Sequence, residues 1–215
     1  MVAASKMFKS RAAKNIVIVG CGGHAKVIAD IVLQSGDLIK GFLAAENGCS
    51  SFMGMPILGL DDDYSKFLDC YFVLAVGDSN ARERLSKYMA GVRWYTAIHP
   101  SAVVSSLDTY IGLGTVVMAN AVINPGTRIA NHCIINTAAV VEHDCQINDF
   151  SHISVGAKLA GGVHVGRQVH IGIGASVREQ TTICDKCMVG AGAVIVNDLE
   201  LPGRYVGVPA KILNA

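Results

Sequence analysis

The chain has 215 residues, 51% of them hydrophobic, so it is long enough to bury a substantial core. Its formal net charge is only +1 and its lysines and arginines are dispersed, which excludes the basic surface of a nucleic-acid-binding protein. No apolar run approaches the roughly 20 residues of a membrane-spanning helix. Seven cysteines, an odd number, favour reduced thiols, and we therefore expect a cytoplasmic protein.

The N-terminal residues show no pattern of secondary structure. Residues 1–14 carry basic side chains but no apolar stretch of signal-peptide length, and we expect a disordered leader there.

Residues 15–98 alternate between strand and helix patterns. The expected elements are strands at 16–19, 39–43 and 71–76 and helices at 26–33 and about 81–89. This order predicts a Rossmann-like α/β domain with a parallel sheet, which binds ligands where its strands end. Gly20-Cys21-Gly22-Gly23-His24-Ala25 loosely matches a phosphate-binding loop between a strand and a helix. A dinucleotide site also needs an acidic residue after the second strand, and Ala44-Ala45 stands there, which disfavours a dehydrogenase.

Residues 99–215 contain a repeat with a period of six. Every sixth residue from 111 to 195 is aliphatic: Ile111, Val117, Ile123, Ile129, Ile135, Val141, Ile147, Ile153, Leu159, Val165, Ile171, Val177, Ile183, Val189 and Ile195. Four residues after each, from Thr115 to Ala193, stands a small or aliphatic residue. We expect both sets to face inward in a parallel β-helix whose triangular coils have three hexads each. Gly or Asn often follows the aliphatic residue, and we expect it to supply the backbone conformation of the corner.

Two motifs lie within the repeat, Val140-Val141-Glu142-His143-Asp144 and Phe150-Ser151-His152-Ile153-Ser154-Val155-Gly156. Together with the glycine-rich loop, over about residues 15–213, they resemble the bacterial hexapeptide-repeat sugar acetyltransferases that act on nucleotide-linked 4-amino-4,6-dideoxy sugars, and the related sialic acid O-acetyltransferases. The resemblance implies left-handed coils, a homotrimer, and acetyl-CoA as co-substrate without a metal. The implied product is an N-acetylated nucleotide sugar, UDP- or GDP-linked, for surface glycan or glycoprotein synthesis.

The resemblance also implies roles for individual residues. His143 is the general base and Asp144 raises its basicity; His152, Ile173 and Ala191 contact acetyl-CoA; Gly22, Gly23, His24, Gly77 and Asn136 bind the nucleotide sugar. The chemistry agrees for His143, because amide formation from a thioester needs a base and histidine suits neutral pH. Relatives that bind UDP-sugars usually carry an acidic pair where this chain has Ala44-Ala45, so the nucleotide stays open.

Three alternatives remain at this point. The acceptor atom could be a hydroxyl of sialic acid or a related sugar instead of an amine. A zinc carbonic anhydrase would use His152 and His170, eighteen residues apart and so stacked on adjacent coils, with His164 nearby. A protein that only binds a nucleotide sugar would leave the His143-Asp144 pair without a role.

Overall fold

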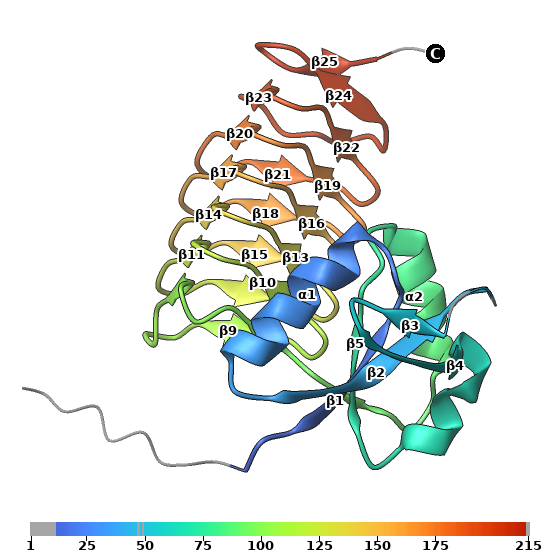
Figure 1. Ribbon diagram of the computed structural model, residues 1–215. Helices are drawn as coiled ribbons and strands as arrows, with labels where there is room; N and C mark the ends of the chain where they lie inside the picture. The colour runs from blue at the N-terminus through green and yellow to red at the C-terminus, as the bar shows by residue number, and fades with distance from the viewer. Residues whose placement is uncertain (1–11, 47, 49, 214–215) are drawn as a thin grey trace, which may run out of the picture.

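The computed structural model describes residues 12–46, 48 and 50–213, so residues 1–11 of the predicted leader lie outside the described residues. The described chain consists of an α/β domain followed by a stack of triangular coils, with the domain set against one side of the stack near its first coils (Figure 1). Within these residues, no helix is long and apolar enough to cross a membrane.

The α/β domain is built on a six-stranded sheet in the order β3-β4-β2-β1-β5-β6. Its strands are β1 (Asn15–Val19), β2 (Leu38–Ala44), β3 (Ser51–Phe52), β4 (Met55–Leu60), β5 (Tyr71–Leu74) and β6 (Arg93–Trp94). Its helices are α1 (Gly23–Gln34), the 3-10 helix η1 (Asp61–Phe67) and α2 (Ser79–Tyr88). All strand pairs are parallel except β3 with β4, which confirms the parallel sheet predicted from the alternating pattern.

Helix α1 lies between the sheet and the coils. Its apolar face buries Ala25, Ile28, Ala29, Ile31 and Val32. This face shares one hydrophobic cluster with the sheet residues Ile16 and Ile18 and with the coil residues Val116, Met118 and Ile134. Because the same core crosses from the sheet to the coils, the domain has a defined position against the β-helix.

The coils form a left-handed β-helix with three parallel sheets. The first sheet, which faces the α/β domain, contains β7 (Ala97–Ile98), β10 (Val116–Val117), β13 (Ile134–Ile135), β16 (His152–Ile153), β19 (His170–Ile171) and β22 (Met188–Val189). The second contains β8 (Val103–Val104), β11 (Val122–Ile123), β14 (Val140–Val141), β17 (Lys158–Leu159), β20 (Ser176–Val177) and β23 (Val194–Ile195). The third contains β9 (Tyr110–Ile111), β12 (Arg128–Ile129), β15 (Gln146–Ile147), β18 (His164–Val165) and β21 (Thr182–Ile183).

The interior of the coils follows the predicted period. The aliphatic residues from Val117 to Ile195 and the small residues from Thr115 to Ala193 are buried, and Ile111 packs against this core. The last coil is covered by β24 (Arg204–Val206) and β25 (Lys211–Ile212), with Tyr205 in the same cluster. The tail therefore shields apolar surface that a coil stack would otherwise expose.

The corner prediction was wrong by two positions. The left-handed backbone conformation falls three residues after the inward aliphatic residue, for example at Asn120 (φ 58°) and Asp144 (φ 60°). Glycine directly after the aliphatic residue serves close stacking instead: a Cβ at Gly172 would lie 2.5 Å from the carbonyl oxygen of Val189 on the next coil.

Candidate active site

His143 and Asp144 form an exposed pair where the second sheet turns into the third. Asp144 occupies the left-handed corner position, which Asp tolerates better than most residues. The His143 Nδ1 lies 2.9 Å from Asp144 Oδ2, and the side chains are 61% and 72% exposed. A carboxylate at Nδ1 fixes the proton there, so Nε2 presents its lone pair to solvent. The pair has the arrangement of a general base and its orienting carboxylate.

Two glycines on neighbouring coils make room for this pair. A Cβ at Gly161 would lie 2.6 Å from Cε1 and Nε2 of His143, and a Cβ at Gly126 would lie 2.4 Å from Asp144 Oδ1. Each is eighteen residues from its neighbour, so the coil stacking itself places them. Neither glycine was predicted as part of the site, although the eighteen-residue period could have located both.

His152 and Asn136 meet on the first sheet. The Asn136 Nδ2 lies 3.0 Å from His152 Nε2, and the His152 ring packs 4.7 Å from the His170 ring on the next coil. Burial, and then the positive field of His170 and Arg82, lowers the pKa of His152 to about 3. The imidazole of His152 is therefore neutral near pH 7 and suits polar contact with a ligand better than proton transfer.

The glycine-rich loop of the α/β domain lies near His152, since His24 contributes to the field at the His152 ring. Gly22 caps α1 and Gly23 begins it, and a Cβ at either position would meet nothing within 4 Å. His24 is held neutral, because burial and the nearby Arg82 lower its pKa to about 4. Its Nε2 is buried and has no hydrogen-bond partner among the described residues. The N-terminus of α1 thus offers main-chain N–H groups and one unpaired ring nitrogen.

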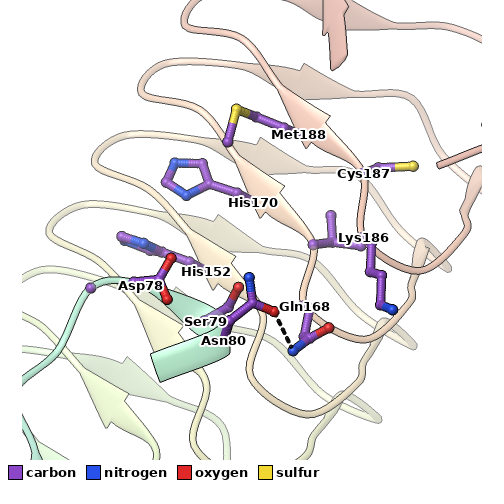
Figure 2. A pocket seen from close by; sticks show the side chains of 11 residues that line it. Asp78, Ser79, Asn80, His152, Gln168, His170, Lys186, Cys187 and Met188 are labelled. Atoms are coloured by element: carbon purple, nitrogen blue, oxygen red, sulfur yellow. Dashed lines mark hydrogen bonds between the residues drawn. The ribbon is translucent and has the colours of Figure 1, made fainter. Parts of the chain in front are cut away.

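A cavity of about 240 Å³ joins the two parts of the chain. Figure 2 shows Asp78, Ser79 and Asn80, at the start of α2, on one side, and His152 and His170 on the coil face, with Asn80 hydrogen-bonded to Gln168. Gly77 also lines this cavity, so Gly77 and His152 border the same space.

A second cavity, of about 500 Å³, lies where β1, β2 and β5 end. Val76, Ala81 and Leu85 give it apolar walls, and Arg84 and Tyr88 line it as well. Asp61 and Asp62, from η1, face it beside Ala45. Burial and the neighbouring Asp62 raise the pKa of Asp61. Carboxylates are therefore present at this edge, supplied by η1 and not by the residues that follow β2.

Ile173 and Ala191 lie at a third place, the corner between the first and second sheets. The two residues are exposed and stacked, and the N–H of Gly192 donates to the carbonyl of Ile173. Within one chain, the predicted residues thus form three groups. Ile173 and Ala191 lie at the corner between the first and second sheets, and His143 and Asp144 lie at the corner between the second and third. The remaining residues lie near the domain junction: Gly22, Gly23, His24, Gly77, Asn136 and His152.

The three histidines of the zinc alternative do not meet within one chain. His152 and His170 pair on the first sheet, as their spacing predicted, but His164 is on the third sheet and is exposed. Within the ranges that the structure describes, no group of three His, Cys, Asp or Glu side chains could hold a metal ion.

A left-handed β-helix with an exposed His–Asp pair, fused to a parallel α/β domain, defines a hexapeptide-repeat acyltransferase. Residues 15–89 match the PglD N-terminal domain family. The acetyltransferase domain of PglB from Neisseria gonorrhoeae FA1090, in complex with acetyl coenzyme A, is 35% identical with a TM-score of 0.88, and the match covers 94% of this chain and 100% of that one. PerB from Caulobacter crescentus, in complex with CoA and GDP-perosamine, is 37% identical with a TM-score of 0.87, over 95% and 100% of the two chains.

The UDP-N-acetylbacillosamine N-acetyltransferase of Bacillus subtilis (strain 168) is 39% identical over 114 residues, 49% of this chain. The match covers 52% of that relative, so this chain spans about half the length of the curated enzyme. Taken with the fold, these similarities show that the chain belongs to the hexapeptide-repeat sugar acetyltransferases with a PglD-type N-terminal domain.

Proposed function

We propose that the protein transfers the acetyl group of acetyl-CoA to the 4-amino group of a nucleotide-linked 4-amino-4,6-dideoxy sugar. The observation that carries the proposal is the His143–Asp144 pair, with its 2.9 Å contact at Nδ1 and its open Nε2. The relatives named above support the substrate class, since one is complexed with acetyl coenzyme A and another with GDP-perosamine. The product would serve surface glycan or glycoprotein synthesis in the cytoplasm, where the six free cysteines of the described residues would stay reduced.

The proposed reaction is a direct attack on the thioester. The neutral sugar amine attacks the carbonyl carbon of acetyl-CoA while Nε2 of His143 accepts the proton that the amine loses. The tetrahedral intermediate then collapses, the C–S bond breaks, and the imidazolium returns the proton to the CoA sulfur. Asp144 stabilises the imidazolium between the two transfers. The products are an acetamido sugar and CoA.

The nucleotide sugar would be held by the α/β domain, residues 15–98. The 500 Å³ cavity beside β1, β2 and β5 suits a nucleoside, because it combines apolar walls with Tyr88 and the carboxylates of Asp61 and Asp62. The N-terminus of α1, with Gly22 and Gly23, would take the diphosphate. The sugar would then extend toward the junction cavity that Gly77 and His152 share.

A homotrimer would complete the site. In one chain, the α/β domain covers the first sheet, whereas His143 lies where the second sheet meets the third. Around a threefold axis, the exposed corner of one prism faces the neighbouring prism, so His143 can meet a sugar bound by the neighbour. Ile173 and Ala191 would line the acetyl-CoA channel in the groove between the two prisms.

Acetyl transfer by the His143→Ala variant tests the proposal. We expect the turnover rate to fall by about 10²–10⁴-fold, because a positioned general base contributes that much. The variant should keep its oligomeric state and thermal stability, since the side chain is 61% exposed. Release of free CoA is the assay, with matched amine and hydroxyl acceptors. A variant that kept more than about a tenth of the wild-type rate would exclude His143 as the base.

Binding of nucleotides tests the assignment of the larger cavity. We expect one of UDP, GDP and CMP to bind at least about tenfold more tightly than the others, because base edges differ in donors and acceptors. Asp62→Asn should weaken the binding of that nucleotide more than the binding of the other two. Isothermal titration of the three nucleotides measures this. Equal affinities, unchanged by the variant, would place the nucleotide elsewhere.

A further inference from the structure

Arg82, in the first turn of α2, is a buried cation at the junction of the α/β domain and the coils. Its side chain is 2% exposed, although arginine is rarely buried. Within the described part of the chain, no carboxylate forms an ion pair with its guanidinium. Burial lowers the pKa of Arg82 only to about 10, so the group remains charged at neutral pH.

Among the described residues, every hydrogen bond of this side chain is to a main-chain carbonyl. Nη1 donates to the carbonyls of Val76 (3.1 Å) and Gly77 (2.7 Å), in the loop that leaves β5. Nε donates to the carbonyl of His132 (3.1 Å) and Nη2 to that of Phe150 (2.5 Å). His132 and Phe150 are left-handed corner positions on adjacent coils. One guanidinium therefore links the substrate-side loop of the domain to two corners of the β-helix.

Packing alone does not account for a charge in this place. An aliphatic side chain could fill the same space without the several kcal/mol that burying an ion costs. The planar fork of arginine has five N–H donors in a fixed geometry, which suits carbonyls that converge from separate segments. Since main-chain carbonyls are the acceptors, the side chain fixes backbone positions and not side-chain orientations.

The residues tied together belong to the two halves of the site. Gly77 lines the junction cavity from the domain side, and His152, two residues after Phe150, lines it from the coils. A second set of contacts, from Glu83 to Arg167 (3.1 Å) and Gln168 (2.6 Å), crosses the same junction farther out. Arg82 is thus the buried member of the contacts that set how far the Gly77 loop stands from the coil face.

We propose that Arg82 is a positioning residue that holds the Gly77 loop against the β-helix and so aligns a domain-bound nucleotide sugar with the acetyl-transfer position. This role rests on the proposed function. The guanidinium of Arg82 does not line the nucleotide cavity and borders it only through the carbonyl of Val76, so its loss should impair alignment more than nucleotide binding. Misalignment by about 1 Å can reduce a rate by about 10²-fold.

The test compares Arg82→Lys and Arg82→Met with the wild-type enzyme. We expect kcat to fall at least about tenfold. The Kd for the free nucleotide and the KM for acetyl-CoA should stay within about threefold, because neither ligand crosses the junction alone. Hydrogen exchange of the Ala81 amide, which donates to Asp78 Oδ1 at the end of this loop, should also become faster in both variants, a readout that needs no activity.

Arg93→Lys is the matched control. Arg93 also donates to a main-chain carbonyl, that of Asp69, but within the α/β domain and exposed to solvent. Its kcat should be unchanged. An unchanged kcat in both Arg82 variants would overturn the proposal, as would equal losses of nucleotide affinity and kcat, or failure of both variants to fold, which would make Arg82 a purely structural residue. Wild-type protein that transfers no acetyl group would instead overturn the proposed function.

Discussion

At the scale of single residues, the position of the His143 ring depends on residue 161 being a glycine, which has no side chain. Gly161 lies under the ring, and a methyl group there would come within 2.6 Å of Nε2. We expect Gly161→Ala to displace the imidazole and lower kcat at least about tenfold, since a general base must stay within hydrogen-bond reach of its proton. Steady-state kinetics with acetyl-CoA and the nucleotide sugar measure the effect.

The same substitution should leave the fold alone. Gly161 does not have a left-handed backbone, and the neighbour it would meet is the end of an exposed side chain that can move away. Thermal unfolding should therefore match the wild type. A Gly161→Ala enzyme with normal kcat would show that the ring is positioned by the bound substrates instead.

The residues of the site differ in how far sequence could find them. His143 and Asp144 are adjacent in the chain, so their contact is local and the motif predicts it. Arg82 and Gly161 act on residues 68 and 18 positions away, respectively, through a domain junction and a coil repeat. Arg82 in particular looks like an ordinary surface arginine of a polar helix until the fold buries it.

At the scale of elements, the face between the domain and the coils carries buried, neutral histidines. Burial lowers the pKa of His132 to about 4, and its ring stacks on Phe150 and meets the edge of Trp94. In the unfolded chain a histidine has a pKa near 6.5, so the unfolded state binds more protons between about pH 4 and 6.5. The contribution of the neutral His132 to the free energy of unfolding is therefore fully present above about pH 6.5 and is lost as the pH decreases toward 4.

For His132 alone this loss is about 2 kcal/mol at pH 5 relative to pH 7. Urea unfolding at the two pH values measures it. In His132→Asn the difference should shrink by about that amount, and Asn suits the left-handed backbone at this position (φ 53°). His164→Gln, at an exposed histidine, is the control that should keep the wild-type difference. An undiminished pH dependence in His132→Asn would show that the ring is already protonated in the fold.

The hexads show which features of an element can be predicted from the sequence. The narrow interior accepts only aliphatic and small side chains, so burial imposes a period that composition reveals directly. The left-handed corner positions are occupied by glycine but also by Asn120, His132, Phe150 and Lys186. Because side chains there point away from the narrow interior and differ from coil to coil, the corner leaves little compositional signal, and its predicted position was wrong.

At the scale of the whole molecule, the fold separates two groups of residues that the proposed reaction needs together. His24 belongs to the α/β domain on the first sheet, and His143 lies at the opposite corner of the prism. The sequence shows both histidines in one chain. It gives no sign that, in the proposed trimer, the two histidines of one chain belong to two different inter-chain sites. The triangular section of the coils, which follows from three hexads a turn, is what sets them apart.

Mixed trimers distinguish a site within one chain from a site between chains. His24→Ala and His143→Ala should each lose most activity as homotrimers. When the two variants are co-expressed in equal amounts, each site between neighbours takes its His24 and its His143 from different chains. Random assembly then gives two intact residues in about one quarter of the sites. Every trimer that carries both tags has one such site among its three, so trimers purified through both tags should have about one third of the wild-type activity. Activity no greater than that of the separate variants would place both residues in one chain's site.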